Sequence, residues 1–116
     1  MLEFICYPKC TTCQKAKKWL DNNSINYELR DIKEENPSYD ELKQWYEKSG
    51  IEIKKFFNTS GLLYKSMDLK NKLAYMSDEE KLRLLSTDGM LVKRPILVCE
   101  EFVLVGFNEK EWLDIV

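Results

Sequence analysis

A strand, a helix and a second strand are predicted between residues 2 and 32, and this unit restricts the fold more than any other feature. The segment LEFICY is short, apolar and rich in β-formers, and Pro8 ends it. Between residues 11 and 23 the apolar side chains recur at helical spacing, with lysines on the remaining face. The segment INYELRDI alternates as a half-buried strand does. Such a unit pairs its strands in parallel through a right-handed crossover.

Residues 38 to 88 are predicted to be mostly helical. Two capping boxes, Ser38 with Glu41 and Ser77 with Glu80, satisfy free N–H groups at helix starts. Apolar residues follow each box at helical spacing. Because no segment rich in proline, glycine or serine bounds this region, we expect a helical insert within a single domain of residues 1 to 116.

After Gly89 the pattern returns to strands. The segments ILVC and FVLVGF are separated only by Glu100 and Glu101, which predicts a tight hairpin. A last helix is predicted from Asn108, and three of its residues are expected in the core: Trp112, Leu113 and Val116. The order of elements predicts an α/β fold with a thioredoxin-like (glutaredoxin-like) mixed sheet, flanked by helices and carrying a helical insertion in the middle of the chain.

The charge balance argues against nucleic-acid binding. The 116 residues include 18 lysines and arginines against 20 aspartates and glutamates, for a net charge of -2, so no large basic face is implied. The N-terminus lacks the basic start of a signal peptide, and no segment approaches the ~18 apolar residues of a membrane span. We therefore expect a cytoplasmic protein without direct contact to nucleic acid or membrane, and we expect it to be a monomer.

Two cysteines, Cys10 and Cys13, lie where the first strand gives way to the helix, in YPKCTTCQ. They could be a redox pair, half of a metal site, or buried thiols without a function. Free N–H groups at the helix start favour a thiolate at Cys10, and Lys9 adds a positive charge. Cys13, one helical turn later, can attack a mixed disulfide formed on Cys10. The spacing therefore favours a redox pair.

The metal interpretation is weaker. A closed zinc site needs four ligands, whereas this chain offers one cysteine pair and no histidine. Cys6 and Cys99 lie in predicted apolar strands, where simple burial is the favoured interpretation. We therefore expect neither a metal nor a cofactor.

A second group of functional residues is predicted in VKRPILV. Pro95 directly precedes a strand, and in the thioredoxin layout this proline faces the cysteine pair. Arg94 would then bring a guanidinium able to hold an oxyanion or the Cys10 thiolate, with Lys93 as a less directional neighbour. The alternative is a solvated basic pair before a strand.

Four segments resemble the ArsC/Spx family, which contains glutaredoxin-coupled arsenate reductases and Spx-type regulators of RNA polymerase. They are YPKCTTCQKAKKWL, FFNTSGLLYK, DGMLVKRPILV and VGFNEKEW, and the resemblance covers nearly the whole chain. It implies a thioredoxin-like fold with a helical insertion and a cis peptide bond between Arg94 and Pro95.

The arsenate reductases resembled carry one nucleophilic cysteine, matched by Cys10, and usually a serine where this chain has Cys13. They hold the oxyanion with three arginines. Arg94 matches one, while Asn58 and Gly106 stand at the other two positions. The resemblance therefore implies weak arsenate binding.

The regulators resembled keep both cysteines as an oxidation switch and usually continue past the last helix. Our leading hypothesis is a thiol-disulfide oxidoreductase, arsenate reductase-like by family, with Cys10 as nucleophile, Cys13 as resolving thiol and Arg94 as a further catalytic residue. Glutathione, glutaredoxin or thioredoxin would be the reductant. The alternative is an Spx-like regulator that binds the α-subunit of RNA polymerase. Four further residues are expected to bind substrate: Lys9, Thr11, Thr12 and Pro95.

Overall fold

The computed structural model describes residues 2–115 and contains a four-stranded sheet in the order β2-β1-β3-β4. The strands are β1 (Glu3–Cys6), β2 (Glu28–Asp31), β3 (Ile96–Val98) and β4 (Val103–Val105). Strand β1 is parallel to β2 and antiparallel to β3, and β3 is antiparallel to β4. The mixed sheet and its parallel first pair are confirmed, although each strand is shorter than the apolar segment that predicted it.

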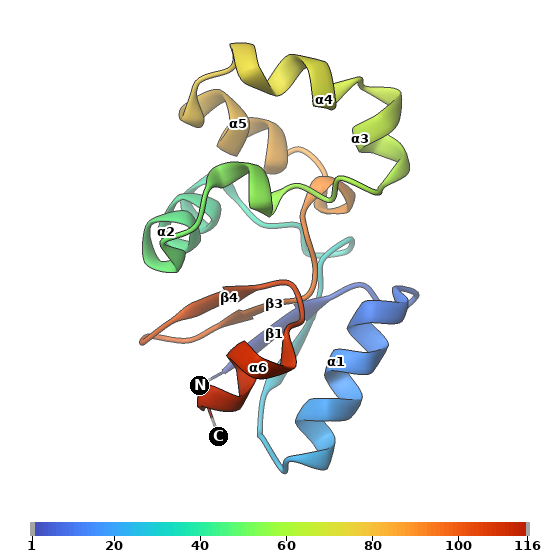
Figure 1. The fold of residues 1–116 in the computed structure, drawn as a ribbon, viewed down its shortest axis with the longest axis vertical. Coiled ribbons are helices and arrows are strands. Elements are labelled where there is room, and N and C mark those ends of the chain that lie inside the picture. The colour runs from blue at the N-terminus through green and yellow to red at the C-terminus, as the bar shows by residue number, and fades with distance from the viewer. Residues whose placement is uncertain (1, 116) are drawn as a thin grey trace.

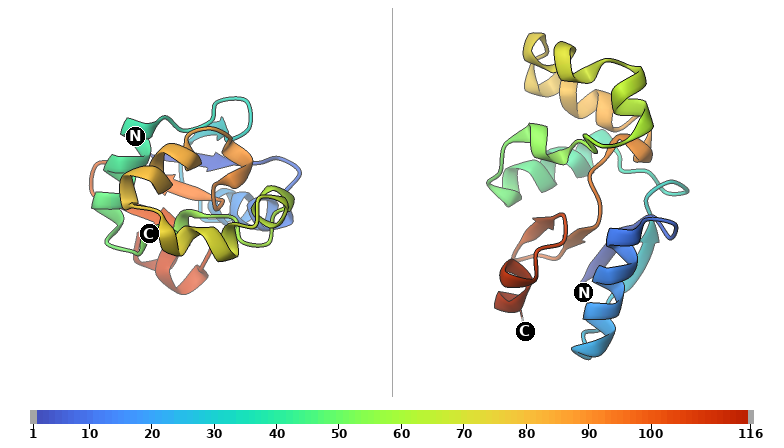
Figure 2. Two further views of the ribbon diagram at one scale, coloured as in Figure 1. Left: turned by 90° about the horizontal axis from the view of Figure 1, so that it is seen from above. Right: turned by 45° about the vertical axis from the view of Figure 1, so that its right-hand side comes forward.

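Helices cover both faces of this sheet (Figure 1). Helix α1 (Thr11–Asn22) joins β1 to β2 and lies on one face with α6 (Glu109–Trp112). The other face carries the insert, with α2 (Tyr39–Ser49), α3 (Leu62–Ser66), α4 (Leu69–Lys72) and α5 (Asp78–Leu85). Figure 2 shows the same three layers from another side. The thioredoxin-like α/β fold with a helical insertion is confirmed.

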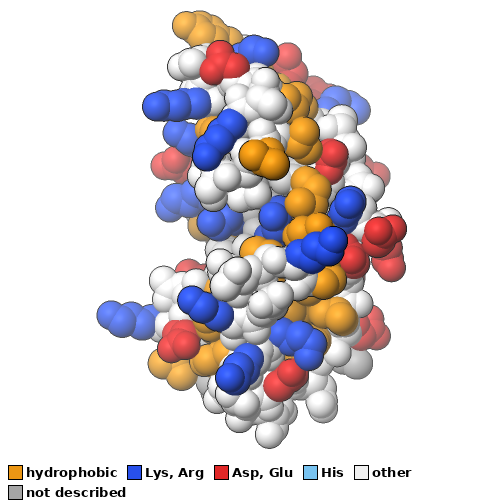
Figure 3. Space-filling model, turned by 90° about the vertical axis from the view of Figure 1, so that its right-hand side faces the viewer, with side chains coloured by type: hydrophobic (Ala, Val, Ile, Leu, Met, Phe, Trp, Pro, Cys, Tyr) orange, Lys and Arg blue, Asp and Glu red, His pale blue; other side chains and the backbone are white. Residues whose placement is uncertain are grey.

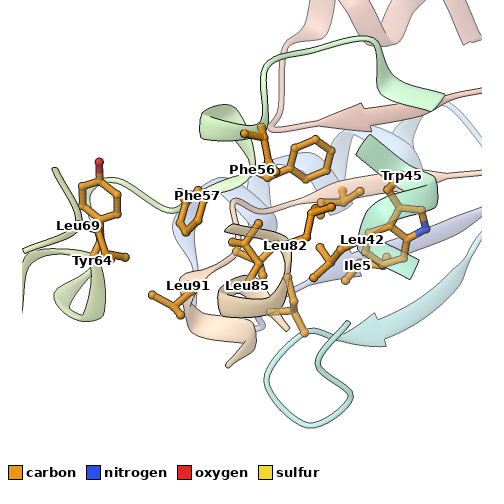
Figure 4. Close-up of a cluster of buried hydrophobic side chains, with 14 of the residues drawn as sticks. Ile5, Leu42, Trp45, Phe56, Phe57, Tyr64, Leu69, Leu82, Leu85 and Leu91 are labelled. Carbon is orange, nitrogen blue, oxygen red and sulfur yellow. The ribbon is translucent and has the colours of Figure 1, made fainter. Parts of the chain in front are cut away.

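The alternation of side chains along the strands builds two cores. Phe4 and Leu97 point to the face covered by α1 and α6, whereas Ile5 and Ile96 point to the insert. Figure 4 shows part of the larger core on the insert side, where aromatic and leucine side chains from α2, α5 and the connecting segments pack together. The insert is therefore fixed to the sheet by buried apolar surface.

Local signals place the insert's helices as predicted. The side chains of Ser38 and Ser77 accept hydrogen bonds from the N–H groups of Glu41 and Glu80, and both reciprocal bonds are present. The chain leaves the insert at Gly89, where any Cβ atom would collide with the carbonyl group of Ile32. Only glycine allows this close approach of the two backbones.

Two predictions about the C-terminal region are wrong. Cys99 lies after β3 in the hairpin turn rather than inside a strand, and its partly exposed thiol contacts the Glu101 carboxylate. Leu113 is 56% exposed because α6 makes a single turn that buries Trp112, and the chain then tightens into a 3-10 turn. Val116 lies outside the described residues. Within residues 2–115, no helix has both the length and the apolar character needed to cross a bilayer.

Arg30 ties the edge strand β2 to the start of α2. Its Nη1 and Nη2 atoms donate to the two carboxylate oxygens of Glu41 at 2.7 and 2.9 Å, and Nη1 lies 3.6 Å from Glu3. The guanidinium also lies over the Trp45 ring, at 5.8 Å from its centroid. Hydrogen bonding from Arg30 lowers the pKa of Glu41 below its usual value. This ion pair therefore contributes to folding only while Glu41 is ionised.

We expect Glu41→Gln to lower the free energy of unfolding by about 1 kcal/mol at pH 7, since the pair is partly exposed. A carboxyl group whose pKa is lowered on folding stabilises the fold above its unfolded pKa of about 4.3 and loses that contribution as the pH falls through the folded value. The difference between wild type and variant should therefore shrink as the pH falls below about 4.3. Urea unfolding between pH 3 and pH 7 measures this difference in the free energy of unfolding. Glu80→Gln is the matched control, because Glu80 has no arginine partner. A difference independent of pH would contradict the assignment.

Candidate functional site

Cys10 is the N-cap residue of α1 and carries a free, partly exposed thiol. Its N–H donates to the Tyr7 carbonyl at 2.9 Å, and its carbonyl accepts from the Gln14 N–H at 3.0 Å. The Gln14 side chain donates to the Pro8 carbonyl at 3.0 Å, which closes the loop between β1 and α1. The thiol itself makes no capping hydrogen bond to the helix, so the first-turn N–H groups remain available to negative charge.

Cys13 lies one turn along α1 in a different environment. Its side chain is buried, with 2% of its surface exposed, and the Tyr7 N–H donates to its Sγ at 3.3 Å. Hydrogen bonding with the Cys6 thiol, together with burial, raises the pKa of Cys13 well above its usual range. The thiol also interacts with that of Cys10. The pair thus combines one accessible thiol with one buried, protonated thiol.

Arg94 reaches the same region from the segment before β3. Its guanidinium lies over the Tyr7 ring, with Cζ 5.2 Å from the ring centroid. The Nε and Nη1 atoms are buried and have no hydrogen-bond partner among residues 2–115. Arg30, by contrast, is paired with two carboxylates. The peptide bond between Arg94 and Pro95 is cis, which confirms the expectation drawn from the family resemblance.

A pocket of about 600 Å³ brings these segments together. Its polar lining residues are Cys10, Thr12, Asn58, Ser60, Lys93 and Arg94. The apolar part of the wall comes from Leu62, Leu63 and Met90. Buried, unpaired guanidinium N–H groups beside an accessible thiol suit a ligand that carries negative charge.

Not every predicted site residue lines this pocket. Lys9 and Thr11 are exposed beside Cys10 but outside the lining, while Cys13 and Pro95 are buried behind it. The roles of Lys9, Thr11 and Pro95 in substrate binding stay predictions. Ser60 and the apolar wall were not predicted as lining residues, because nothing in the local pattern of the insert shows that it folds back over the cysteine pair.

The surface around the site carries mixed charge. Figure 3 shows the side of the molecule on which α1 and α3 lie, where several lysine and arginine side chains lie near one another in the upper half and others are spread among acidic, apolar and neutral ones. Within the described part of the chain, no three histidine, cysteine, aspartate or glutamate side chains are grouped in a way that could hold a metal ion.

Comparison with known proteins gives the family. The model of the ArsC family matches residues 6–115. The chain belongs to the ArsC family. Among ArsC-family relatives it is 52% identical to the protein YusI of Bacillus subtilis (strain 168), over 96% of this chain and 94% of that protein. It is 33% identical to the regulatory protein MgsR of the same organism, over 97% of this chain and 87% of that protein.

Solved structures agree with this assignment to the ArsC family. A crystal structure of an ArsC family related protein from Bacteroides fragilis superposes with a TM-score of 0.98. That protein is 53% identical, and the superposition covers 99% of this chain and 97% of the other. The chain therefore shares both its family and its fold with that protein.

Proposed function

We propose that this ArsC-family protein is a thiol-disulfide oxidoreductase with Cys10 as nucleophile and Cys13 as resolving thiol. The observation that carries the proposal is the contrast between the two thiols. Cys10 opens onto the pocket at the first turn of α1, while Cys13 is buried one turn behind it and interacts with it. An accessible thiol attacks external disulfides, and an inaccessible one next to it reacts only with what the first has captured.

The reaction proceeds in two exchanges. The Cys10 thiolate attacks one sulfur of a substrate disulfide, a mixed disulfide forms, and the other substrate sulfur leaves as a thiolate. Cys13 then attacks the Cys10 sulfur, and the remaining substrate thiolate leaves and takes up the proton that Cys13 loses. The substrate gains two electrons, and the protein becomes a Cys10–Cys13 disulfide. Glutathione, glutaredoxin or thioredoxin returns the two electrons.

Arg94 binds the negative charge of the substrate in this proposal. Its guanidinium lines the pocket and is paired with no carboxylate among the described residues, so its charge can attract a carboxylate of a glutathione moiety. Charge-assisted bonds of this kind contribute about 1.5 to 3 kcal/mol each. Lys93, which also lines the pocket, supplies additional positive charge without a fixed geometry.

Replacing Arg94 by methionine should weaken substrate binding without lowering the stability of the fold. We expect kcat/KM for a glutathionylated peptide to fall by about 10- to 150-fold, the equivalent of one lost charge-assisted bond. The free energy of unfolding should stay about level, because the variant loses the contact with the Tyr7 ring but also removes two buried N–H groups that have no partner. Arg30→Met is the matched control, and it should lose stability while the folded protein keeps its activity. An Arg94→Met variant that unfolds readily but stays active would make Arg94 a structural residue.

Covalent capture tests the proposal in a cell lysate. In Cys13→Ser the second exchange cannot occur, so mixed disulfides should accumulate on Cys10 and release their partners on reduction. The Cys10→Ser and Cys13→Ser double variant is the control and should capture nothing. Equal capture by both variants would contradict the assigned roles.

A regulatory function is the second candidate, because MgsR is a regulatory protein and aligns over nearly the whole chain. In that case the Cys10–Cys13 disulfide would act as a switch for binding to RNA polymerase, as the resemblance to Spx-type regulators implies. Binding of the purified polymerase α-subunit to the reduced and the oxidised protein tests this directly. Redox-dependent binding together with negligible disulfide turnover would favour the regulator over the oxidoreductase.

A further inference from the structure

A third thiol belongs to the cluster around Cys13. Cys6 ends β1, is 4% exposed, and shares one buried cluster with Cys13, against which Cys10 packs. The Tyr7 N–H lies 3.3 Å from Cys13 Sγ, and Tyr7 directly follows Cys6 in the chain. The Cys13 sulfur is thus held against the backbone at Cys6 as well as beside Cys10, and all three cysteines are free thiols.

We propose that Cys6 is a second disulfide partner of Cys13, so that the Cys10–Cys13 disulfide can rearrange into a Cys6–Cys13 disulfide. The functional consequence rests on the proposed oxidoreductase function, but the linkage itself does not. The two thiols can meet without moving through the core, because Cys6 and Cys13 already lie on the same side of the sheet under α1. Cys99 is excluded from this exchange, since it lies in the β3–β4 turn outside that cluster.

The rearrangement needs no external oxidant or reductant, because every bond and electron pair is accounted for within the protein. The Cys6 thiol loses its proton and its sulfur attacks Cys13 Sγ. The Cys6–Cys13 bond forms as the Cys10–Cys13 bond breaks, and the Cys10 sulfur leaves with the electron pair and takes up the proton that Cys6 loses. One thiol is consumed and one is released, so the protein as a whole is neither oxidised nor reduced. The released thiol lies at the start of α1 and faces the pocket.

This exchange would change the kind of chemistry available to the oxidised protein. With Cys6 and Cys13 joined, Cys10 is again free at the pocket but has lost its resolving partner. The protein could then still form a mixed disulfide with a substrate, but release would need an external thiol such as glutathione. The third thiol thus converts a two-cysteine reductase into a one-cysteine form without unfolding or added oxidant.

Peptide mapping distinguishes the two linkages. Trypsin cleaves after Lys9 and Lys15, so Cys6 falls on peptide 1–9, whereas Cys10 and Cys13 share peptide 10–15. A Cys10–Cys13 bond stays inside peptide 10–15, and a Cys6–Cys13 bond joins the two peptides. The first arm oxidises Cys10→Ser with hydrogen peroxide, a two-electron oxidant small enough to reach buried thiols that oxidised glutathione cannot reach. We expect peptides 1–9 and 10–15 to be recovered joined, and this product to be lost in the Cys6→Ala and Cys10→Ser double variant.

The second arm oxidises the wild type with one equivalent of oxidised glutathione and then alkylates it with iodoacetamide. The joined peptides should carry an alkylated Cys10, and Cys6→Ala should lower the yield of alkylated Cys10 in the oxidised fraction at least fivefold. Cys99→Ser is the matched control and should change nothing. Because Cys10 is partly exposed, Cys10→Ser is expected to fold even if Cys6→Ala does not, and circular dichroism checks both.

The outcomes separate this inference from the proposed function. Failure of Cys10→Ser to form an intramolecular Cys6–Cys13 bond, whether it gives only sulfinic and sulfonic acids or disulfide-linked dimers, overturns the inference. An internal bond in peptide 10–15 of the wild type would still support the oxidoreductase in that case. Conversely, joined peptides in Cys10→Ser, together with a wild type that forms neither an internal nor a joining disulfide, would support the inference and contradict the proposed function.

Discussion

Replacing Cys10 by serine is expected to lower kcat/KM for a glutathionylated peptide at least about a thousandfold, to the rate of the uncatalysed exchange. A serine hydroxyl is a weak nucleophile unless a neighbouring base takes its proton, and the chain contains no histidine. Cys13 cannot replace Cys10, because it is buried and its raised pKa keeps it protonated at neutral pH. The variant therefore loses the nucleophile without gaining another.

The assay follows release of the peptide thiol with glutathione as reductant, over the same concentrations for each protein. Cys99→Ser is the matched control, because its thiol lies in the hairpin turn and contacts only Glu101 among the described hydrogen bonds. It should keep full activity. More than a tenth of the wild-type rate in Cys10→Ser would mean that another group performs the first exchange.

Arsenate should be reduced far less efficiently than a small disulfide, judged by kcat/KM. A tetrahedral oxyanion needs several charge-assisted hydrogen bonds, each worth about 1.5 to 3 kcal/mol. Arg94 is the arginine that lines the pocket. Asn58 lines it as a neutral amide, and Gly106 has no side chain to contribute. Two missing guanidinium contacts amount to about 3 to 6 kcal/mol, which lowers arsenate turnover by about two to four powers of ten relative to a site with three arginines.

Arsenate and disulfide turnover are compared with the same glutathione and glutaredoxin supply, and Cys10→Ser serves as the control for both. Efficient, saturable arsenate reduction that disappears in Cys10→Ser would contradict this prediction. Lys93 would then be the residue to test by Lys93→Met, since it lines the pocket.

The sequence predicted those parts of the molecule that depend on local patterns. The change of period at Thr11, the capping boxes at Ser38 and Ser77, and the proline after Arg94 all have the predicted structure. These features arise from contacts within a few residues or from a layout shared by the family. The shared layout also predicted that Cys10 and Arg94, which are far apart in the sequence, lie at one site. Both residues line the same pocket.

What the sequence did not predict depends on contacts between distant segments. Ser60 and Leu62 line the pocket only because the insert folds over the sheet. Burial of Cys6 was predicted and is confirmed, but its contact with Cys13 follows from how α1 packs on β1. Cys99 was assigned to a strand because its neighbours are apolar, whereas the short hairpin leaves it partly exposed.

The most direct test of the central claim is the mass of the protein after one turnover without added reductant. Reduced wild type and reduced Cys13→Ser are each mixed with one equivalent of a glutathionylated peptide and quenched with acid. The mass of each intact protein is then measured by mass spectrometry. We predict that the wild type loses two hydrogens and releases both thiols, and that tryptic digestion finds its new bond on Cys13, either inside peptide 10–15 or, after rearrangement, joining it to peptide 1–9. Cys13→Ser should instead gain a mixed disulfide on Cys10. A stable adduct on the wild type, or an adduct on Cys13 or Cys99 in place of Cys10, would contradict the assigned roles.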